Sequence, residues 1–342
     1  MWKIKDLLQK ASKERASDIH LTINSPPVFR VDGALQALPG EILTNAVILS
    51  FIEELTTDEQ KKSFEKKGEL DFSYSLSNIG RYRINIFRQR GSYGLAIRLI
   101  PLTAPSPSEL GIPQAVVNLA TLNRGLVLIT GPAGSGKSTT LASLLNLINQ
   151  TRSGHIITIE DPIEYLHKHG KCLINQREVG QDTHSFANAL RAALRQDPDI
   201  ILIGEMRDLE TIAMAMTAAE TGHLVFSTLH TNDAAQAIDR IIDVFPPHQQ
   251  NQIRVQLASV LQGVVAQQLF PLARQKGRVA AFEVLIATAA VRTVIRESKT
   301  HQIHNIIQTS GQKGMQTMKK AVEELVRKGL VSPRVAEERL KG

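Results

Sequence analysis

Apolar and polar residues alternate over short intervals in roughly the first hundred residues, and this pattern predicts an α+β domain. Apolar positions at helical spacing predict helices over residues 4–13 and 45–66. Period-two alternation bounded by turn residues predicts short strands around them. The strands are expected at residues 18–23, 28–31, 35–38, 70–76, 81–88 and 93–100.

The pattern changes after a segment rich in proline. Pro105 and Pro107 lie in this segment and make it the best linker candidate in the chain. Beyond it, continuous apolar runs alternate with helical patterns, which is typical of a parallel α/β sheet. The sequence therefore predicts an N-terminal domain over residues 1–101, a linker over 102–113, an α/β core over 114–289 and a helical region over 290–342.

Composition is that of a soluble globular protein and excludes several classes of function. No apolar run reaches the roughly 18 residues of a membrane span, so no transmembrane segment is expected. The N-terminus lacks the apolar core of a signal peptide, so a cytoplasmic location is expected. The net charge is +7, but basic residues are not interleaved with aromatics, so no nucleic-acid partner is expected. The single cysteine, Cys172, excludes a disulfide framework and a four-cysteine zinc site.

The sequence GPAGSGKS at Gly131–Ser138 matches the phosphate-binding P-loop pattern G-x-x-x-x-G-K-[ST]. It follows a predicted strand and precedes a predicted helix, which disfavours a chance glycine turn. Lys137 is expected to reach the β- and γ-phosphates of ATP, and the Ser138 hydroxyl is expected to bind Mg²⁺. The residues expected to bind the nucleotide are Gly131, Gly134, Ser135, Gly136, Lys137, Ser138 and Thr139.

Two carboxylate clusters follow apolar strands downstream of the P-loop and predict ATP hydrolysis. One strand ends at Gly204 and Glu205, and Gly204 stands where many P-loop enzymes carry a metal-binding aspartate. Glu205 is therefore expected to contact the metal sphere. The turn after an earlier strand carries Asp161 and Glu164, and we favour Glu164 as the group that polarises the attacking water. Spacing alone does not separate Glu164 from Asp161, and a solvated acidic turn is the alternative.

His230 follows a further apolar strand, predicted at residues 224–228. The carboxyl end of this strand is expected near the γ-phosphate, because ligands of open α/β sheets bind at that edge. His230 is therefore a candidate sensor of the phosphate, and a purely structural histidine is the equal alternative.

Four blocks in a fixed order resemble the Walker A, Asp box, atypical Walker B and His box of the secretion ATPases. They read GPAGSGKS, ITIEDPIEY, DPDIILIGEMRD and TGHLVFSTLHTNDA. Over almost the whole chain, the resemblance is strongest to the type IV pilus retraction ATPases, the PilT-like twitching motors. Ala290–Glu297 is similar to the AIRNLIRE segment of these motors, with Thr293 where asparagine is usual. Ala133 replaces a threonine that is common in the family's P-loop.

The resemblance implies an α/β, RecA-like P-loop ATPase core with a smaller PAS-like N-terminal domain, assembled as a homohexamer with ATP at subunit boundaries. It supports Glu164 as the catalytic base and Glu205 as the Walker-B acid. It also implies that Arg83 and Arg98 reach a nucleotide across the subunit boundary. Arg81 and Arg83 share one face of a predicted strand, for which a solvated face is the alternative. The implied function is ATP-driven pilus retraction through an inner-membrane platform protein, with the motor in the cytoplasm and peripheral to that membrane.

Three other functions compete with this interpretation. A pilus assembly or type II secretion ATPase usually carries a longer N-terminal extension and a four-cysteine zinc insert after the His box, and no cysteine follows His230 here. A scaffold that binds nucleotide with little turnover needs no water-activating carboxylates such as Glu164 and Glu205. A nucleic-acid translocase shares the RecA-like core, but no DNA-binding module is recognisable.

Overall fold

The computed structural model describes residues 2–14, 16–31, 33–76, 79–101 and 103–340. The chain divides into two compact units, Met1–Thr103 with Glu164–Leu166, and Ala104–Ile163 with His167–Gly342. The division at Thr103 lies within the predicted linker, whose first residue, Leu102, is outside the described residues. No helix among the described residues is long and apolar enough to cross a membrane.

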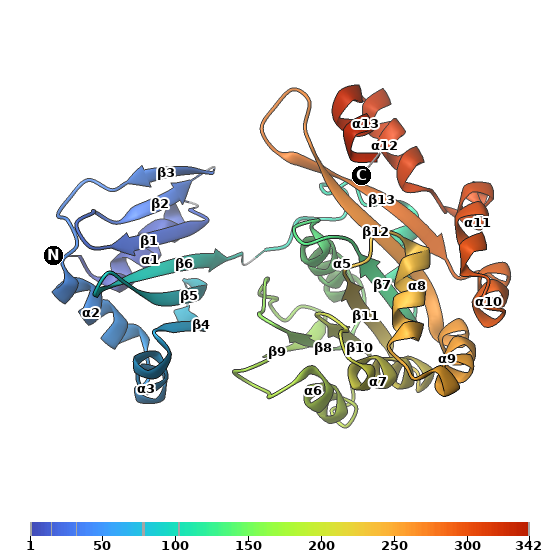
Figure 1. The fold of residues 1–342 in the computed structure, drawn as a ribbon, viewed down its shortest axis with the longest axis horizontal. Helices are drawn as coiled ribbons and strands as arrows, with labels where there is room; N and C mark the ends of the chain where they lie inside the picture. The colour runs from blue at the N-terminus through green and yellow to red at the C-terminus, as the bar shows by residue number, and fades with distance from the viewer. Residues whose placement is uncertain (1, 15, 32, 77–78, 102, 341–342) are drawn as a thin grey trace. The chain divides into compact units, whose positions relative to one another are not determined.

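The N-terminal unit is built on a six-stranded antiparallel sheet in the order β3-β2-β1-β6-β5-β4 (Figure 1). Helices pack on one face, because side chains such as Tyr82, Ile84 and Ile86 are buried at every second position of β5. The elements are α1 (Ile4–Lys13), β1 (Asp18–Thr22), β2 (Val28–Val31), β3 (Ala34–Ala37), α2 (Asn45–Leu55), α3 (Asp58–Lys67), β4 (Glu69–Leu76), β5 (Gly80–Gln89) and β6 (Ser92–Ile100).

The single helix predicted over residues 45–66 is wrong, because the structure has two helices there. α2 ends at Leu55 and α3 begins at Asp58. Thr57 Oγ1 accepts a hydrogen bond from the Gln60 N–H at 3.3 Å, and the Gln60 side chain accepts one from the Thr57 N–H at 3.0 Å. This reciprocal capping box satisfies free N–H groups at a helix start and so begins a second helix.

The second unit is a seven-stranded sheet in the order β13-β12-β7-β11-β10-β8-β9 (Figure 1). All neighbouring strands are parallel except β13, which runs antiparallel to β12. Every residue of β7 is buried, as expected for a strand covered on both faces. The strands are β7 (Gly125–Thr130), β8 (Gly154–Glu160), β9 (Cys172–Glu178), β10 (Ile200–Ile203), β11 (Leu224–Leu229), β12 (Leu261–Pro271) and β13 (Arg278–Ile286).

Helices cover both faces of this sheet. One core contains side chains of Leu126 and Leu128, and the opposite core contains those of the alternate residues Val127 and Ile129. The helices are α4 (Gln114–Leu119), α5 (Lys137–Thr151), α6 (Phe186–Ala193), α7 (Leu209–Glu220), α8 (Ala234–Asp243), α9 (Pro247–Val260), α10 (Ala289–Arg296), α11 (Ile303–Thr309), α12 (Met318–Arg327) and α13 (Pro333–Leu340). The predicted α/β fold class, with a smaller N-terminal α+β part and C-terminal helices, is confirmed.

Candidate active site

The carboxyl ends of four neighbouring parallel strands form the edge at which the predicted nucleotide site lies. The P-loop follows β7, His230 follows β11, Glu205 follows β10, and Glu160 is the last residue of β8. These strands are adjacent in the sheet, so the structure brings the four sequence motifs together at one edge.

The P-loop glycines adopt backbone conformations that other residues rarely adopt. Gly134 and Gly136 have φ values of 74° and 90°, in the left-handed region. Gly131 has φ of 146°, and a Cβ atom there would lie 2.3 Å from the main-chain oxygen of Gln267. Glycine is therefore required at Gly131 both by backbone conformation and by the close approach of β12.

Lys137 and the hydroxyl groups around it fit a bound phosphate. The Lys137 side chain is buried, and its Nζ donates to the carbonyl oxygens of Gly131 at 2.7 Å and Pro132 at 3.0 Å. Ser138 and Thr139 occupy the first turn of α5, where N–H groups and the helix dipole favour an anion. Ser135 Oγ is buried and has no hydrogen-bond partner among the described residues. A buried hydroxyl left without a protein partner is what a site completed by a ligand is expected to contain.

Gln267 on β12 is a P-loop contact that sequence analysis missed. Its Nε2 donates to the main-chain oxygen of Ser135 at 2.9 Å, and its Oε1 accepts from the Thr140 hydroxyl at 2.8 Å. The side chain is 2% exposed, so both hydrogen bonds are shielded from water. A pair of glutamines within an otherwise apolar run, as in VVAQQLF, is the signal that was available in the sequence.

Glu205 and His230 are in direct contact. His230 Nε2 lies 3.2 Å from Glu205 Oε2, and Arg207 Nε lies 2.7 Å from the other carboxylate oxygen of Glu205. The Glu205 side chain is only 14% exposed, whereas those of His230 and Arg207 are 51% and 74% exposed. Glu205 is thus a largely buried carboxylate that contacts two more exposed side chains.

The backbone around Gly204 explains the missing aspartate of the Walker B strand. A Cβ atom on Gly204 would lie 3.3 Å from both the Glu160 Cα atom and the Ile159 oxygen on β8. The Thr228 hydroxyl also donates to the Gly204 oxygen at 2.5 Å. Close contact with β8 therefore leaves little room for a side chain, and Glu205 is the first residue of this strand end that offers a carboxylate.

Glu164 and Asp161 lie in the loop after β8, and both are exposed. Glu164 belongs to the short segment that groups with the N-terminal unit, whereas Asp161 belongs to the second unit. The role of Glu164 as catalytic base stays a prediction, with Asp161 as the open alternative.

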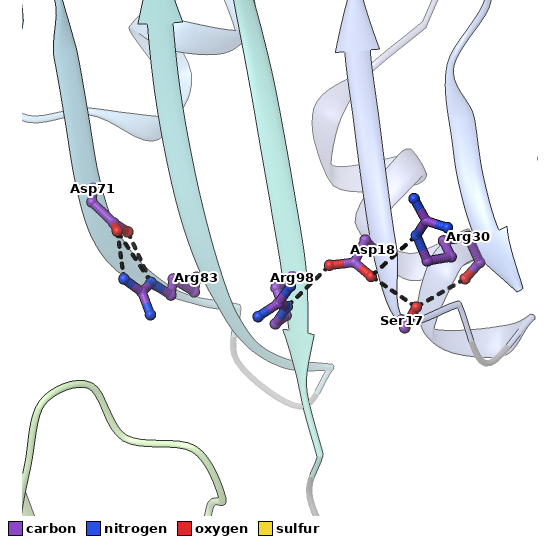
Figure 2. A network of polar contacts seen from close by, with 6 residues as sticks. All are labelled: Ser17, Asp18, Arg30, Asp71, Arg83 and Arg98. Carbon is purple, nitrogen blue, oxygen red and sulfur yellow. Dashed lines mark hydrogen bonds and ion pairs between the residues drawn. The ribbon is translucent and has the colours of Figure 1, made fainter. Parts of the chain in front are cut away.

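Arg83 and Arg98 lie directly opposite each other on β5 and β6 (Figure 2). Like charges opposite each other in a sheet are destabilising, and each arginine is paired with an aspartate. Arg83 Nε and an Nη atom bind Asp71 at 3.0 and 2.6 Å, and Arg98 Nε binds Asp18 at 3.0 Å. Partial burial acts to raise the pKa of Asp18, but hydrogen bonds from Ser17 and Arg98 hold it below its ordinary value. Because Arg83 and Arg98 lie directly opposite each other, their side chains project from the same face of the sheet.

Known proteins resemble this chain along nearly its whole length. It is 48% identical over 338 residues to the type IV pilus retraction ATPase PilT of Pseudomonas aeruginosa, covering 99% of this chain and 98% of the relative. It is 48% identical over 313 residues to a twitching motility protein of Neisseria gonorrhoeae, covering 92% and 84% of the two chains. A crystal structure of the pilus retraction motor PilT with bound ADP superposes with a TM-score of 0.91 at 46% identity, covering 99% of this chain and 97% of that one.

The resemblance inferred from the four sequence motifs is therefore confirmed. The family model described as type II/IV secretion system protein matches residues 2–339. On this full-length agreement of sequence and fold, the chain belongs to the type II/IV secretion system protein family.

Proposed function

We propose that this chain is an ATP-hydrolysing motor that powers type IV pilus retraction. The observation that carries the proposal is the sheet edge at which a complete P-loop, Glu205 and His230 meet. A phosphate-binding loop alone would serve a switch as well, but a largely buried carboxylate at the same sheet edge suits hydrolysis. The pilus function comes from the full-length relatives named above.

In the proposed mechanism, the P-loop binds the phosphates of ATP through its N–H groups. Lys137 exchanges its bonds with the carbonyls of Gly131 and Pro132 for the β- and γ-phosphates. Mg²⁺, when bound, neutralises phosphate charge, and the Ser138 hydroxyl and Glu205 carboxylate offer the oxygen donors that this ion prefers. Glu164 takes the proton of the attacking water, and His230 transmits the loss of the γ-phosphate to Glu205.

The active site is proposed to be shared between subunits of a homohexamer. Arg83 and Arg98 of one subunit approach the nucleotide of its neighbour and stabilise the charge that develops on the γ-phosphate. The segment near Pro105–Pro107 takes up the resulting domain motion. The ring acts on an inner-membrane platform protein of the pilus machinery, from the cytoplasm and peripheral to that membrane.

Restoration of twitching tests the function directly. A bacterium that has type IV pili but lacks its retraction ATPase should twitch again when it expresses this chain. The Glu205→Gln variant, at equal abundance, should not restore twitching. Restored pilus assembly in an assembly-deficient strain, with no effect on retraction, would favour the assembly or secretion alternative. Nucleotide binding without phosphate release in any oligomeric state would favour a scaffold.

A further inference from the structure

The loop after β8 contains a three-residue segment that is assigned to the N-terminal unit, between residues of the second unit. Glu164–Leu166 group with the N-terminal unit, and the residues on either side, Ile163 and His167, belong to the second unit. Ile163, which precedes this segment, is buried, with 2% of its surface exposed. His167 follows the segment, and burial lowers its pKa to about 4. Its imidazole is therefore neutral at neutral pH.

Two side chains of β9 hold the main chain at these two points. Glu178 Oε2 accepts a hydrogen bond from the Ile163 N–H at 3.1 Å. Gln176 Oε1 accepts one from the His167 N–H at 2.8 Å. Gln176 and Glu178 are two residues apart on one strand, so they project from the same face of the sheet.

Further hydrogen bonds hold the Gln176 side chain and the Glu178 main chain. Gln176 Nε2 donates to Glu160 Oε1 at 3.2 Å, and the Thr158 hydroxyl donates to the same oxygen at 2.6 Å. Glu178 is 4% exposed, and its main-chain N–H donates to Asp182 Oδ2 at 2.8 Å. Burial of a carboxylate is unfavourable unless hydrogen bonds compensate for the lost water. The hydrogen bond from the Ile163 N–H to Glu178 is one such compensating contact.

We propose that Gln176 and Glu178 are positioning residues that clamp both ends of the Glu164 segment and thereby set the position of the candidate base. The inference rests on the proposed hydrolytic role of Glu164. Glu164 directly follows Ile163, and consecutive Cα atoms are about 3.8 Å apart, so fixing Ile163 restricts where Glu164 can lie. A misplacement of about 1 Å of a catalytic group can cost roughly 100-fold in rate.

Truncation of each clamp residue tests the inference. Glu178→Ala and Gln176→Ala should each lower kcat for phosphate release by roughly 10- to 100-fold. ATP affinity should stay near that of the wild type, because β11, β10 and β8 lie between β9 and the P-loop strand β7 in the sheet. Glu178→Gln keeps an oxygen acceptor for the Ile163 N–H and should retain most of the rate. Leu173→Ala removes an exposed side chain of the same strand and should leave the rate unchanged.

A second set of variants separates positioning from general loss of structure. In a Glu164→Gln background, Glu178→Ala should cause no further loss of rate, because there is no base left to misplace. An equal loss in both backgrounds, or a loss that follows thermal unfolding, would overturn the clamp and leave the base assignment intact. Wild-type turnover by Glu164→Gln would overturn both the base assignment and the clamp.

Discussion

His230 Nε2 lies 3.2 Å from Glu205 Oε2 and so joins the carboxyl ends of β11 and β10. The Thr228 side-chain hydroxyl on β11 also donates to the main-chain oxygen of Gly204, which follows β10. β11 lies between the P-loop strand and β10, so His230 stands between the phosphate cradle and Glu205 in the order of the sheet. A movement of His230 on loss of the γ-phosphate would therefore change the environment of Glu205 first.

This contact predicts different effects for its two partners. Glu205→Gln should lower kcat by about 100-fold or more, because it removes the carboxylate that acts on the metal sphere or water. His230→Gln should lower it by roughly tenfold, the cost of one hydrogen bond to a charged group. His223→Gln is the matched control, because His223 lies just before the other end of β11 and contacts Ala218 instead. Steady-state phosphate release with saturating ATP measures all three, and equal losses for His223→Gln and His230→Gln would contradict the assignment.

Gln267 is predicted to hold the P-loop in its binding conformation. Gln267→Ala removes the donor to the Ser135 oxygen and the acceptor for Thr140, so it should weaken ATP binding by about tenfold. Gln268→Ala is the control, because the adjacent residue of the strand projects to the other face. Isothermal titration with a slowly hydrolysed ATP analogue gives the affinity. Unchanged affinity for Gln267→Ala would mean that the glycine conformations alone hold the loop.

The part of the site that was predicted from sequence depends on local pattern. The P-loop, Glu205 and His230 each end a continuous apolar strand, and parallel strands place such ends at one edge. Gln267 escaped prediction because its contact with Ser135 spans 132 residues and has no local motif. The Asp71 and Asp18 partners of Arg83 and Arg98 depend on strand register, which alternation alone does not determine.

Elements that adjoin one another were harder to predict than most elements that are separated by turns. Helix α9 ends at Val260 and strand β12 begins at Leu261, so no turn residue separates their apolar patterns. The strand β12 was therefore absent from the prediction. Strand β13 was absent too, although residues 272–277 separate it from β12. The opposite error arose at residues 45–66, where the helical pattern continues across Thr56 and Thr57 although the capping box starts a new helix.

Mixing two inactive variants tests whether Arg83 acts on a neighbouring subunit. Arg83→Gln and Lys137→Ala should each lack turnover, and their mixture should recover part of it, because some boundaries then combine an intact Lys137 with an intact Arg83. The Arg83–Asp71 ion pair is substantially exposed and contributes only about 0.2–1 kcal/mol to stability. Breaking it to reach a neighbouring subunit therefore costs little free energy. A mixture of Arg83→Gln with the Arg83→Gln/Lys137→Ala double variant is the control and should stay inactive. Absence of recovery in mixed oligomers of confirmed composition would argue against a shared site.

His167 should make stability depend on pH in mild acid. Burial lowers its pKa to about 4 in the folded chain, whereas the unfolded chain keeps the ordinary value near 6.5. As pH falls from 6.5 towards 4, the unfolded state takes up a proton that the folded state excludes, so stability falls. The loss between pH 6.5 and pH 5 is roughly 2 kcal/mol. Thermal melting at both pH values should show a smaller acid loss for His167→Gln than for the wild type, and His301→Gln at an exposed position should behave as the wild type does.

Gly204→Asp restores the residue that many P-loop enzymes carry at this position, yet it should damage this protein. The Cβ atom would lie 3.3 Å from the Glu160 Cα and Ile159 oxygen and 3.6 Å from Phe186 Cε1, so the strands must shift to admit it. Overpacking of this kind costs about 1–3 kcal/mol, and the new carboxylate would repel Glu205 and Glu160. Gly204→Ala should show the steric part of the loss without the charge. Thermal melting and phosphate release of both variants test this prediction. Lower stability and lower turnover are expected for Gly204→Asp. A gain in turnover would mean that Gly204, rather than Glu205, marks the metal-binding position of this strand.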